Sequence, residues 1–385
     1  MQLVIEKMVF GGYGLARTKD GVILIENVLP GEVVKADITK KKGGVPVGIP
    51  YEFVETSPHR KEPRCKYVGD CGGCDWQHIE YTQQLNFKRD IFIDCLTRIG
   101  KIKSIPEIEV IPSPQWEYRI RAQLKVNVEK RCIGFFRRKT NEVISIDNCP
   151  LLDPQINILL KNQKEIIPAL TKNVKQLKVI AGTNNSITSK PQVAGFTQSE
   201  ATINVGKIKF IVTGNSFFQG NRFLLENLGR WAEPSVSGKF FIDMYGGLGF
   251  FSIMLGKKFS RGLLIESAEQ QVEQARKSYA DNNMDHISAK ATSAETFFDK
   301  QSNTLPKTDL IIVDPPRPGL TRKVREGIRD LKPRAVLYVS CNPSTQARDV
   351  GFFINKCGYI IERGALFDLY PQTHHMETLL FLRLF

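Results

Sequence analysis

The stretch FFIDMYGGLGFFSIML, residues 240–255, combines an apolar strand, a glycine-rich turn and the start of a helix. A turn of this kind lets the backbone approach a nucleotide-like ligand closely. An acid, Glu266, follows at the end of the next apolar run, where a carboxylate can accept hydrogen bonds from both ribose hydroxyls. The spacing G-G-x-G differs from the G-x-G-x-x-G of dinucleotide sites, so NAD is the weaker candidate.

The alternation of strands and helices continues on both sides of this stretch, from about residue 217 to residue 385. RGLLIES (261–267) is a strand ending in an acid, and AEQQVEQARKSYADNN (268–283) is a polar helix. Two further strand-like runs lie in TDLIIVDPPRPGL (308–320) and RAVLYVSCNPST (334–345). ETLLFLRLF (377–385) is strongly apolar. The pattern predicts an α/β domain with a doubly wound sheet over residues 206–385.

Candidate site residues follow several of these strands. Asp314 precedes two prolines, which make a rigid ledge, and Cys341 stands before Asn342-Pro343. A lone cysteine is usually structural, but one that ends a strand at the ligand-binding edge of a sheet is a candidate nucleophile. Glu377 begins the last apolar run, as a general base or as a solvated strand entry. The adjacent His374 and His375 are expected to be exposed in a loop.

The first 57 residues predict several short strands with tight turns, which suggests a small closed barrel. TKKKGGVPVG, residues 39–48, reads as a basic hairpin tip that grips phosphate or is simply solvated.

Residues 58–205 predict a central β-rich domain with a cysteine cluster. YRIRAQLKVNVE (118–129) alternates with period two and is expected to pair with the segment that starts at Cys132. One helix is expected at about 153–171. A helical segment at about 77–110 is expected to pack on the catalytic domain.

Four of the eight cysteines stand in a ligand-like pattern. Cys65, Cys71 and Cys74 are spaced C-x5-C-x2-C, and Cys149 follows much later, before a proline. Four thiolates suit zinc or an iron–sulfur cluster. Zinc sites more often consist of two C-x2-C pairs, so the cluster is favoured.

The composition sets broad limits on the protein. It has 385 residues, 42% hydrophobic and 24% charged, with a formal net charge of +14. This length predicts two or three domains. The positive charge favours a polyanionic partner. No apolar run reaches transmembrane length and no secretory signal is evident, so we expect a cytoplasmic protein, with a monomer as the default.

Five motifs, in this order, resemble those of the RNA uracil-5-methyltransferase family. They are FFQGN (217–221), DMYGGLGFFS (243–252), VDPPRPG (313–319), SCNPST (340–345) and HHMETLLFL (374–382). The family's glycine loop usually carries a cysteine where this chain has Gly246. The resemblance extends over nearly the whole chain and is closest to bacterial enzymes that methylate 23S ribosomal RNA and carry a TRAM domain, a small OB-like RNA-binding barrel.

The resemblance implies a fold, a reaction and roles for residues. The fold is an OB-like TRAM barrel, a central domain with an iron–sulfur site and a Rossmann-like methyltransferase domain. Cys341 is the expected nucleophile and Glu377 the expected base. The expected cofactors are S-adenosyl-L-methionine, contacted by Gln219, Tyr245, Glu266 and Asp314, and a 4Fe-4S cluster held by Cys65, Cys71, Cys74 and Cys149. Attack of the Cys341 thiolate on carbon 6 of uracil activates carbon 5. The cationic protein is expected to favour the thiolate.

Three other functions stay open from the sequence. The first is the same reaction on the T-loop uridine of transfer RNA. The second is amino-group methylation of DNA or protein, in which an aromatic residue rather than Arg317 follows the proline ledge. The third is RNA binding without catalysis, which the set of Gln219, Asp314, Cys341 and Glu377 disfavours.

Overall fold

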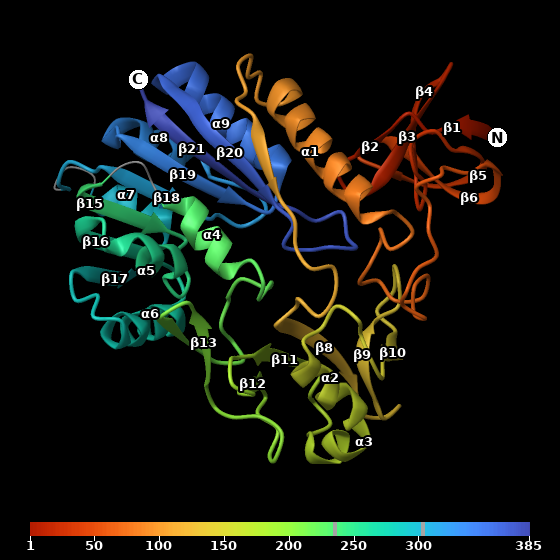
Figure 1. The fold of residues 1–385 in the computed structure, drawn as a ribbon, viewed down its shortest axis with the longest axis horizontal. Helices are drawn as coiled ribbons and strands as arrows, with labels where there is room; N and C mark the ends of the chain where they lie inside the picture. The colour runs from red at the N-terminus through yellow and green to blue at the C-terminus, as the bar shows by residue number, and fades with distance from the viewer. Residues whose placement is uncertain (234–236, 302–304) are drawn as a thin grey trace.

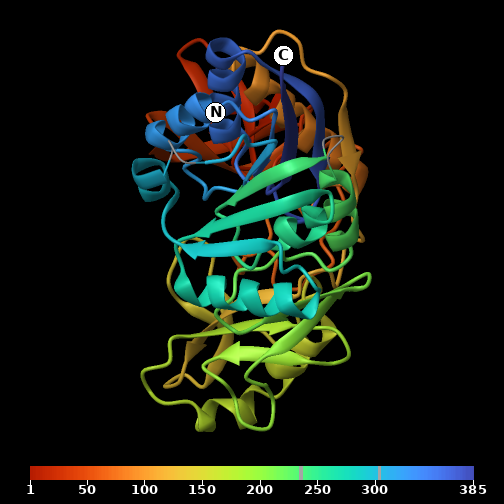
Figure 2. The ribbon, with the colours of Figure 1, turned by 90° about the vertical axis from the view of Figure 1, so that its left-hand side faces the viewer.

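The computed structural model describes residues 1–233, 237–301 and 305–385. In the view of Figure 1, the N-terminal sheet lies at one side, the large C-terminal sheet lies at the other, and the central domain lies below them. Figure 2 shows the central domain at one end of the molecule, beneath the C-terminal sheet. No helix within the described ranges has the length and apolar character needed to cross a bilayer.

The N-terminal unit is one six-stranded sheet with the order β1-β5-β6-β4-β3-β2. Its strands are β1 (Gln2–Val4), β2 (Lys7–Val9), β3 (Tyr13–Thr18), β4 (Gly21–Ile25), β5 (Val33–Lys42) and β6 (Val45–Glu55). The two edge strands, β1 and β2, are separated in sequence only by Ile5 and Glu6, which brings the two edges of the sheet together. A small core of eight buried apolar side chains, including Ile5 and Val28, fills this unit.

The central domain is built on a five-stranded antiparallel sheet with the order β10-β9-β8-β11-β12. Its strands are β8 (Arg121–Asn127), β9 (Cys132–Phe136), β10 (Val143–Ser145), β11 (Gln176–Ala181) and β12 (Ile187–Lys190). The pairing of β8 with β9 confirms the expected hairpin. The helix expected at 153–171 is broken into α2 (Pro154–Lys161), α3 (Gln163–Ile166) and the 3-10 turn Ile167–Ala169. Helical geometry is interrupted at Asn162, and Pro168 disfavours a regular continuation.

The C-terminal domain is an eight-stranded sheet with the order β17-β16-β15-β18-β19-β21-β20-β7. The strands are β7 (Ile108–Ile111), β15 (Gly238–Met244), β16 (Phe259–Glu266), β17 (Ile287–Ala291), β18 (Leu310–Val313), β19 (Ala335–Ser340), β20 (Tyr359–Phe367) and β21 (Glu377–Leu384). Strands β15 to β19 run parallel, as the alternating pattern predicted, whereas β21 is antiparallel to both of its neighbours. A separate hairpin, β13 (Ala201–Val205) with β14 (Ile208–Val212), precedes this domain and spans residue 205.

Apolar side chains cover both faces of the C-terminal sheet. Neighbouring residues of one strand, such as Phe241 and Ile242 of β15, belong to different buried cores, because successive side chains point to opposite faces. The helices that accompany the sheet are α4 (Leu225–Ala232), α5 (Phe250–Gly256), α6 (Glu269–Asp281), α7 (Ala294–Gln301), α8 (Arg322–Leu331) and α9 (Pro343–Cys357). Burial on both faces explains why these strands are near-continuous apolar runs in sequence.

One segment from the first third of the chain belongs to the C-terminal sheet. Helix α1 (Tyr81–Arg98) packs against α9, and Figure 1 shows it between the N-terminal strands and the C-terminal domain. Strand β7, a short distance further along the chain, pairs in parallel with β20 at the edge of the sheet. This segment therefore ties the N-terminal part of the chain to the side of the sheet that carries Glu377.

Candidate active site

The glycine turn after β15 has the tight backbone geometry that the sequence predicted. Tyr245, Gly247 and Gly249 all have positive φ angles, of 59°, 55° and 77°. A Cβ atom on Gly246 would lie 2.7 Å from the Leu264 side chain and 3.1 Å from the Asp243 carboxyl. A larger residue there would displace one of them, so Gly246 matches its surroundings in this chain. The turn leaves the backbone open to a ligand above the sheet.

Glu266, at the end of β16, is fixed beside this turn. Its Oε2 accepts a hydrogen bond from the backbone N–H of Gly247 at 3.1 Å, and its Oε1 accepts one from Ala268 N–H at 2.8 Å. Oε1 also accepts a bond from Ser267 Oγ at 3.1 Å, a hydroxyl that can rotate away, and Oε2 keeps a second lone pair that can accept a bond from a ligand hydroxyl. The arrangement therefore fits the vicinal hydroxyls of a ribose.

Cys341 and Glu377 are brought together by the register of two antiparallel strands. Ser340 of β19 is paired with Thr378 of β21, and Thr378 Oγ1 donates a hydrogen bond to Ser340 O at 3.0 Å. Cys341 follows Ser340 and Glu377 precedes Thr378, so the thiol and the carboxyl lie next to each other at the end of this ladder. Backbone pairing therefore sets the distance between the two backbones, while the loop that precedes Glu377 packs beside its side chain.

Asp314 and Gln219 lie at the same edge. Asp314 follows β18, and its backbone N–H donates to Met244 O at 3.3 Å. Its Oδ2 accepts a hydrogen bond from Gln219 Nε2 at 3.4 Å. The structure thus joins FFQGN to the proline ledge, although the two segments are 95 residues apart.

All six predicted catalytic and cofactor residues line one cavity of about 960 Å³: Gln219, Tyr245, Glu266, Asp314, Cys341 and Glu377. This volume accommodates a nucleoside-sized ligand together with a second base. Sequence reasoning assigned no site role to Arg317, Tyr370, Thr373 or His375, which also line the cavity. The turn residues Tyr370 to His375 carry no strong local pattern, so only their place before Glu377 hinted at a role.

The pKa of the Cys341 thiol is raised, contrary to the expectation that the cationic protein favours its thiolate. Burial, together with the negative charges of Glu377 and Asp314, raises the pKa of the Cys341 thiol to about 11, while Arg317 lowers it. Burial, together with the charge of Asp314, raises the pKa of Glu377 well above its usual value. Local acids outweigh the net positive charge of the chain because their charges lie close to the thiol in a desolvated site.

A second carboxyl of this cavity, that of Asp314, also has a raised pKa. Burial, together with the charge of Asp243, raises the pKa of Asp314 to about 7. Asp314, Glu377 and Cys341 therefore form a coupled set whose members avoid being charged together. Perturbed acids next to a nucleophile in a cleft are typical of a catalytic site.

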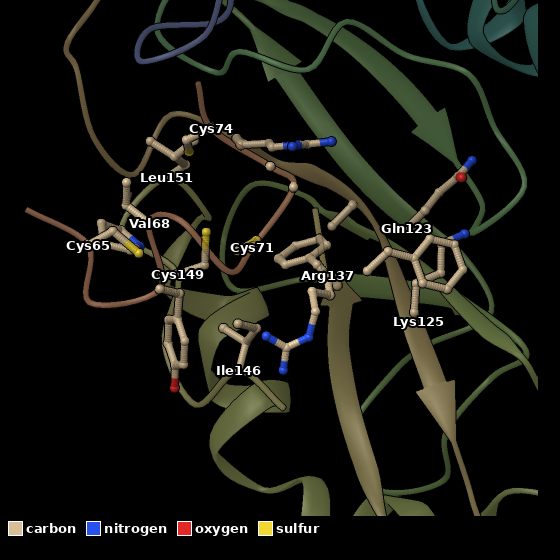
Figure 3. A pocket seen from close by; sticks show the side chains of 18 of the residues that line it. Cys65, Val68, Cys71, Cys74, Gln123, Lys125, Arg137, Ile146, Cys149 and Leu151 are labelled. Carbon is tan, nitrogen blue, oxygen red and sulfur yellow. The ribbon is translucent and has the colours of Figure 1, made fainter. Parts of the chain in front are cut away.

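The four predicted ligand cysteines line a second cavity, of about 450 Å³, in the central domain. Figure 3 shows the side chains of Cys65, Cys71, Cys74 and Cys149 on one side of this cavity, with Gln123 and Lys125 on the other. Burial raises the pKa of the Cys149 thiol to about 11 and also raises the pKa of Cys71 and Cys74. The fold of the chain thus brings Cys149 close to three cysteines that lie more than 70 residues before it in the sequence.

The four thiols around this cavity are ligands that an iron–sulfur cluster or a zinc ion could use. Within the described ranges, no three His, Cys, Asp or Glu side chains are close enough to hold one metal ion. A cluster of several irons spans more space than one zinc ion, whose ligands all lie at about 2.0–2.3 Å. Gln77 is 2% exposed, and its side-chain Nε2 has no hydrogen-bond partner, whereas its Oε1 accepts a hydrogen bond from Cys65 N–H at 3.1 Å. A buried donor beside converging thiols fits a sulfur-rich, electron-dense group.

The basic segment after β9 has partners within the protein. Arg137 pairs with Asp70 and Glu142, and Lys139 pairs with Glu26 of the N-terminal unit at 2.7 Å. Arg138 lies 3.9 Å from the same Glu26. In contrast, Lys41 and Lys42 at the β5–β6 tip are exposed. The segment 137–139 therefore connects the central domain to the N-terminal sheet in addition to carrying positive charge.

Comparisons with known proteins agree with this geometry. Residues 193–384 match the family model described as tRNA (Uracil-5-)-methyltransferase. An RNA methyltransferase of Aquifex aeolicus is 31% identical, with 99% of this chain and 98% of the relative covered. A 23S rRNA (uracil(1939)-C(5))-methyltransferase of Shewanella sediminis is 26% identical over 98% of this chain and 94% of its own length.

A solved structure resembles the whole chain. The Pyrococcus abyssi tRNA (uracil-54, C5)-methyltransferase in complex with S-adenosyl-L-homocysteine superposes with a TM-score of 0.77. It is 26% identical, and 99% of this chain and 100% of that chain are covered. Taken with the motifs and the cavity, these likenesses show that the chain belongs to the RNA uracil-5-methyltransferase family and is an RNA (uracil-5-)-methyltransferase.

Proposed function

We propose that this enzyme methylates carbon 5 of a specific uridine in 23S ribosomal RNA, through a covalent bond between Cys341 and the uracil ring. The observation that carries the proposal is the β19–β21 register, which sets Cys341 beside Glu377 at the wall of the large cavity. The 23S rRNA enzymes among the relatives support this RNA, and the N-terminal sheet provides a unit for binding it.

The expected ligand of the glycine turn is S-adenosyl-L-methionine, which supplies an electrophilic methyl group. Glu266 would accept hydrogen bonds from its ribose hydroxyls, and Tyr245 and Gln219 would contact the rest of the molecule. Asp314 lies between this region and Cys341, so it would contact both the methyl donor and the uracil.

Cys341 would begin the reaction by attacking carbon 6 of the uracil. The new S–C6 bond takes the electrons of the 5,6 double bond onto carbon 5 and the O4 enolate, which makes carbon 5 nucleophilic toward the methyl group. The thiol must lose its proton first. The Asp314 carboxylate, whose pKa is about 7, would accept that proton, and the Arg317 cation would stabilise the thiolate that forms.

Glu377 would complete the reaction. After methylation, carbon 5 carries one hydrogen too many. Glu377 would take that proton, the freed electron pair would re-form the 5,6 double bond, and the S–C6 bond would break to release the Cys341 thiolate. The raised pKa of Glu377 makes it a stronger base than an exposed carboxylate.

The parts around this site would hold the RNA and the cluster. Since C5 and C6 of a stacked base cannot reach the thiol, the target uridine would be flipped into the cavity. The N-terminal unit would act as a TRAM-like RNA-binding barrel over residues 1–57, followed by the central domain (58–205) and the methyltransferase domain (206–385). Cys65, Cys71, Cys74 and Cys149 would hold a 4Fe-4S cluster with a structural role, and the enzyme would work in the cytoplasm as a monomer.

A second candidate is the same reaction on the T-loop uridine of transfer RNA. The structural likeness to the Pyrococcus abyssi tRNA enzyme over the whole chain favours it. Because the proposed chemistry is identical, only the RNA that becomes labelled separates the two.

The test is to offer labelled S-adenosyl-L-methionine with either 23S ribosomal RNA or total transfer RNA and to identify the labelled nucleoside. We expect 5-methyluridine in the ribosomal RNA. The Glu377→Gln variant should accumulate a covalent RNA–protein adduct that survives denaturation. The double variant Cys341→Ala/Glu377→Gln is the control and should form none.

If only the transfer RNA became labelled, the proposed substrate would be wrong and the proposed mechanism would stand. Labelled 5-methyluridine without any adduct in Glu377→Gln would contradict the assignment of Cys341 and Glu377.

A further inference from the structure

The loop between β20 and β21 forms part of the wall of the large cavity. Its residues Tyr370, Thr373 and His375 line the cavity, and it leads directly into Glu377. The sequence suggested that His374 and His375 are exposed, but both are partly buried. The contacts that hold this loop therefore influence the orientation of the Glu377 side chain.

The first half of the loop is held through its backbone. Tyr118 Oη donates to Pro371 O at 3.0 Å, and Gln372 N–H donates to Gln84 Oε1 at 2.9 Å. Gln372 O in turn accepts a hydrogen bond from Trp76 N–H at 3.0 Å. These anchors come from α1 and the segments around it, far from the loop in sequence.

The second half of the loop is held by one carboxylate, that of Asp75. Asp75 Oδ1 accepts a hydrogen bond from His374 N–H at 3.0 Å, and its Oδ2 contacts His374 Nδ1. The two side chains are 23% and 21% exposed, and Gly12 of the N-terminal sheet packs against both. A carboxylate that binds both the backbone and the ring of one residue fixes the position and the orientation of that residue.

The His374 ring, held in this way, packs against His375 in the cavity wall. Its ring centroid lies 4.2 Å from that of His375, and the rings are inclined at 42°. His375 lines the cavity two residues before Glu377 and lies edge-on to Tyr370. Asp75 therefore acts on the reacting region through two packed imidazoles, without itself lining the cavity that holds Cys341.

We propose that Asp75, acting through His374, is a positioning residue for the proton abstraction by Glu377. The proposal rests on the proposed function above. The Asp75–His374 link holds residues 373–376 in the conformation in which His375 covers the uracil and Glu377 faces carbon 5. Without the link, the adduct forms and is methylated, but its C5 proton is lost slowly.

The structure separates this second step from the first. Cys341 is held by β19 and by the segment after it, where Asn342 Nδ2 donates to Arg317 O at 2.9 Å. None of these contacts involves the loop of residues 370–376. Thr378 stays in the ladder with Ser340, and the backbone of Glu377 stays paired with Phe367 of β20, so loosening the loop changes the orientation of the Glu377 side chain without displacing the thiol.

The experiment is a single-turnover reaction on RNA that carries tritium at C5 of its uridines, with methyl-labelled S-adenosyl-L-methionine. In the parent enzyme, methyl incorporation and tritium release should run in parallel. In Asp75→Ala, methyl incorporation should stay within about threefold of the parent. Tritium release should slow by about 10–100-fold, and a covalent methylated adduct should accumulate, since small misplacement of a catalytic group costs rates of this order.

A second variant breaks the same link from the other side. His374→Ala should separate the two signals as Asp75→Ala does, and the double variant should be no worse than either single one, because the two residues act as one unit. Asp75→Asn keeps an acceptor for His374 N–H and should be intermediate. Glu80→Gln, which breaks the exposed 2.9 Å pair of Glu80 with His59 in the same part of the chain, is the matched control and should behave as the parent.

The outcomes decide between positioning and mere support of the fold. If methyl incorporation and tritium release stay parallel in Asp75→Ala and His374→Ala, whether fast or slow, the proposal is overturned. If Asp75→Ala does not fold or loses iron, His374→Ala and Asp75→Asn carry the test. Failure of the proposed function looks different, because the parent would then release no tritium and Glu377→Gln would trap no adduct.

Discussion

The two cavities of this protein both hold buried thiols, but the thiols have different neighbours. Burial raises the pKa of Cys341 in one cavity and of Cys149 in the other, each to about 11. Cys341 faces the acids Glu377 and Asp314 and the cation Arg317, whereas Cys149 faces other cysteines and the cation Arg119. Burial by itself therefore does not distinguish a nucleophile from a ligand. The neighbouring groups differ, because carboxyls can exchange protons with a thiol, whereas several converging thiols are a set of ligands that a metal group could use.

The largest effect should come from removing the lone thiol. Cys341→Ser should lower methylation by about 10⁴-fold or more, since an alcohol is a far weaker nucleophile than a thiolate. Incorporation of labelled methyl into RNA measures this loss. Cys357→Ser, which changes a cysteine at the far end of α9, should keep the parent rate. If the Cys341→Ser enzyme kept a hundredth of the parent activity or more, Cys341 would not be the nucleophile and the contrast between the two cavities would fail.

A cysteine from the other cavity should affect stability rather than chemistry. Cys149→Ser should lower the iron content and the absorbance of the cluster, and destabilise the protein by about 2–4 kcal/mol, because metal binding contributes to folding. Thermal unfolding of matched preparations measures this change, and methyl transfer per folded molecule should stay within about tenfold. Loss of catalysis with fold and RNA binding intact would show that the cluster has a further role.

The pH dependence of Cys341 tests the charges around it. Asp314 raises the pKa of this thiol, so Asp314→Asn should lower it and increase the thiolate fraction near pH 8. Alkylation of Cys341 by iodoacetamide, followed by peptide mass spectrometry, should become several-fold faster at that pH. Lowering the pKa of a thiol by one unit raises its thiolate fraction by about tenfold at most. Because the pKa of Asp314 is about 7, the difference from the parent should shrink below pH 6, where Asp314 is neutral. Slower alkylation in Asp314→Asn would contradict this electrostatic picture.

The smallest effect should come from charges outside both cavities. Replacing Lys41 and Lys42, at the exposed β5–β6 tip, by Ala should weaken RNA binding by about 3–10-fold near physiological salt. The slope of log affinity against log salt should fall by about 1–2, because up to two phosphate contacts are lost. Filter binding across a salt series measures both. An unchanged slope would mean that the tip is merely solvated.

Much of the C-terminal domain was visible in the sequence because its strands are buried on both faces and give apolar runs. Glu266, Asp314 and Cys341 stand at or just after the ends of such runs, where an open α/β sheet builds its site. The antiparallel register of β21 was not visible, since it depends on which strands become neighbours. The addition of β7 to the same sheet depends on pairing across more than 250 residues, which no local pattern reports.

The contacts of the loop before Glu377 were hidden for the same reason. Asp75 and His374 are 299 residues apart, and neither stands in a local pattern that predicts an ion pair. The broken helix after Asp153 is a local error of another kind. Pattern reasoning continued the apolar period through Pro168, although proline removes a backbone donor and ends regular helix.

The β19–β21 register also has a consequence for how such an enzyme changes its target. The backbone spacing of Cys341 and Glu377 is set at the end of a ladder between two buried strands, which surface substitutions leave alone. The N-terminal sheet and the central domain can therefore diverge in shape and charge while the chemistry stays constant, as long as Gly12 and Asp75 keep their contacts with His374. An evolutionary change of RNA target, or an engineered chimera that exchanges residues 1–57, then needs no redesign of the reacting groups.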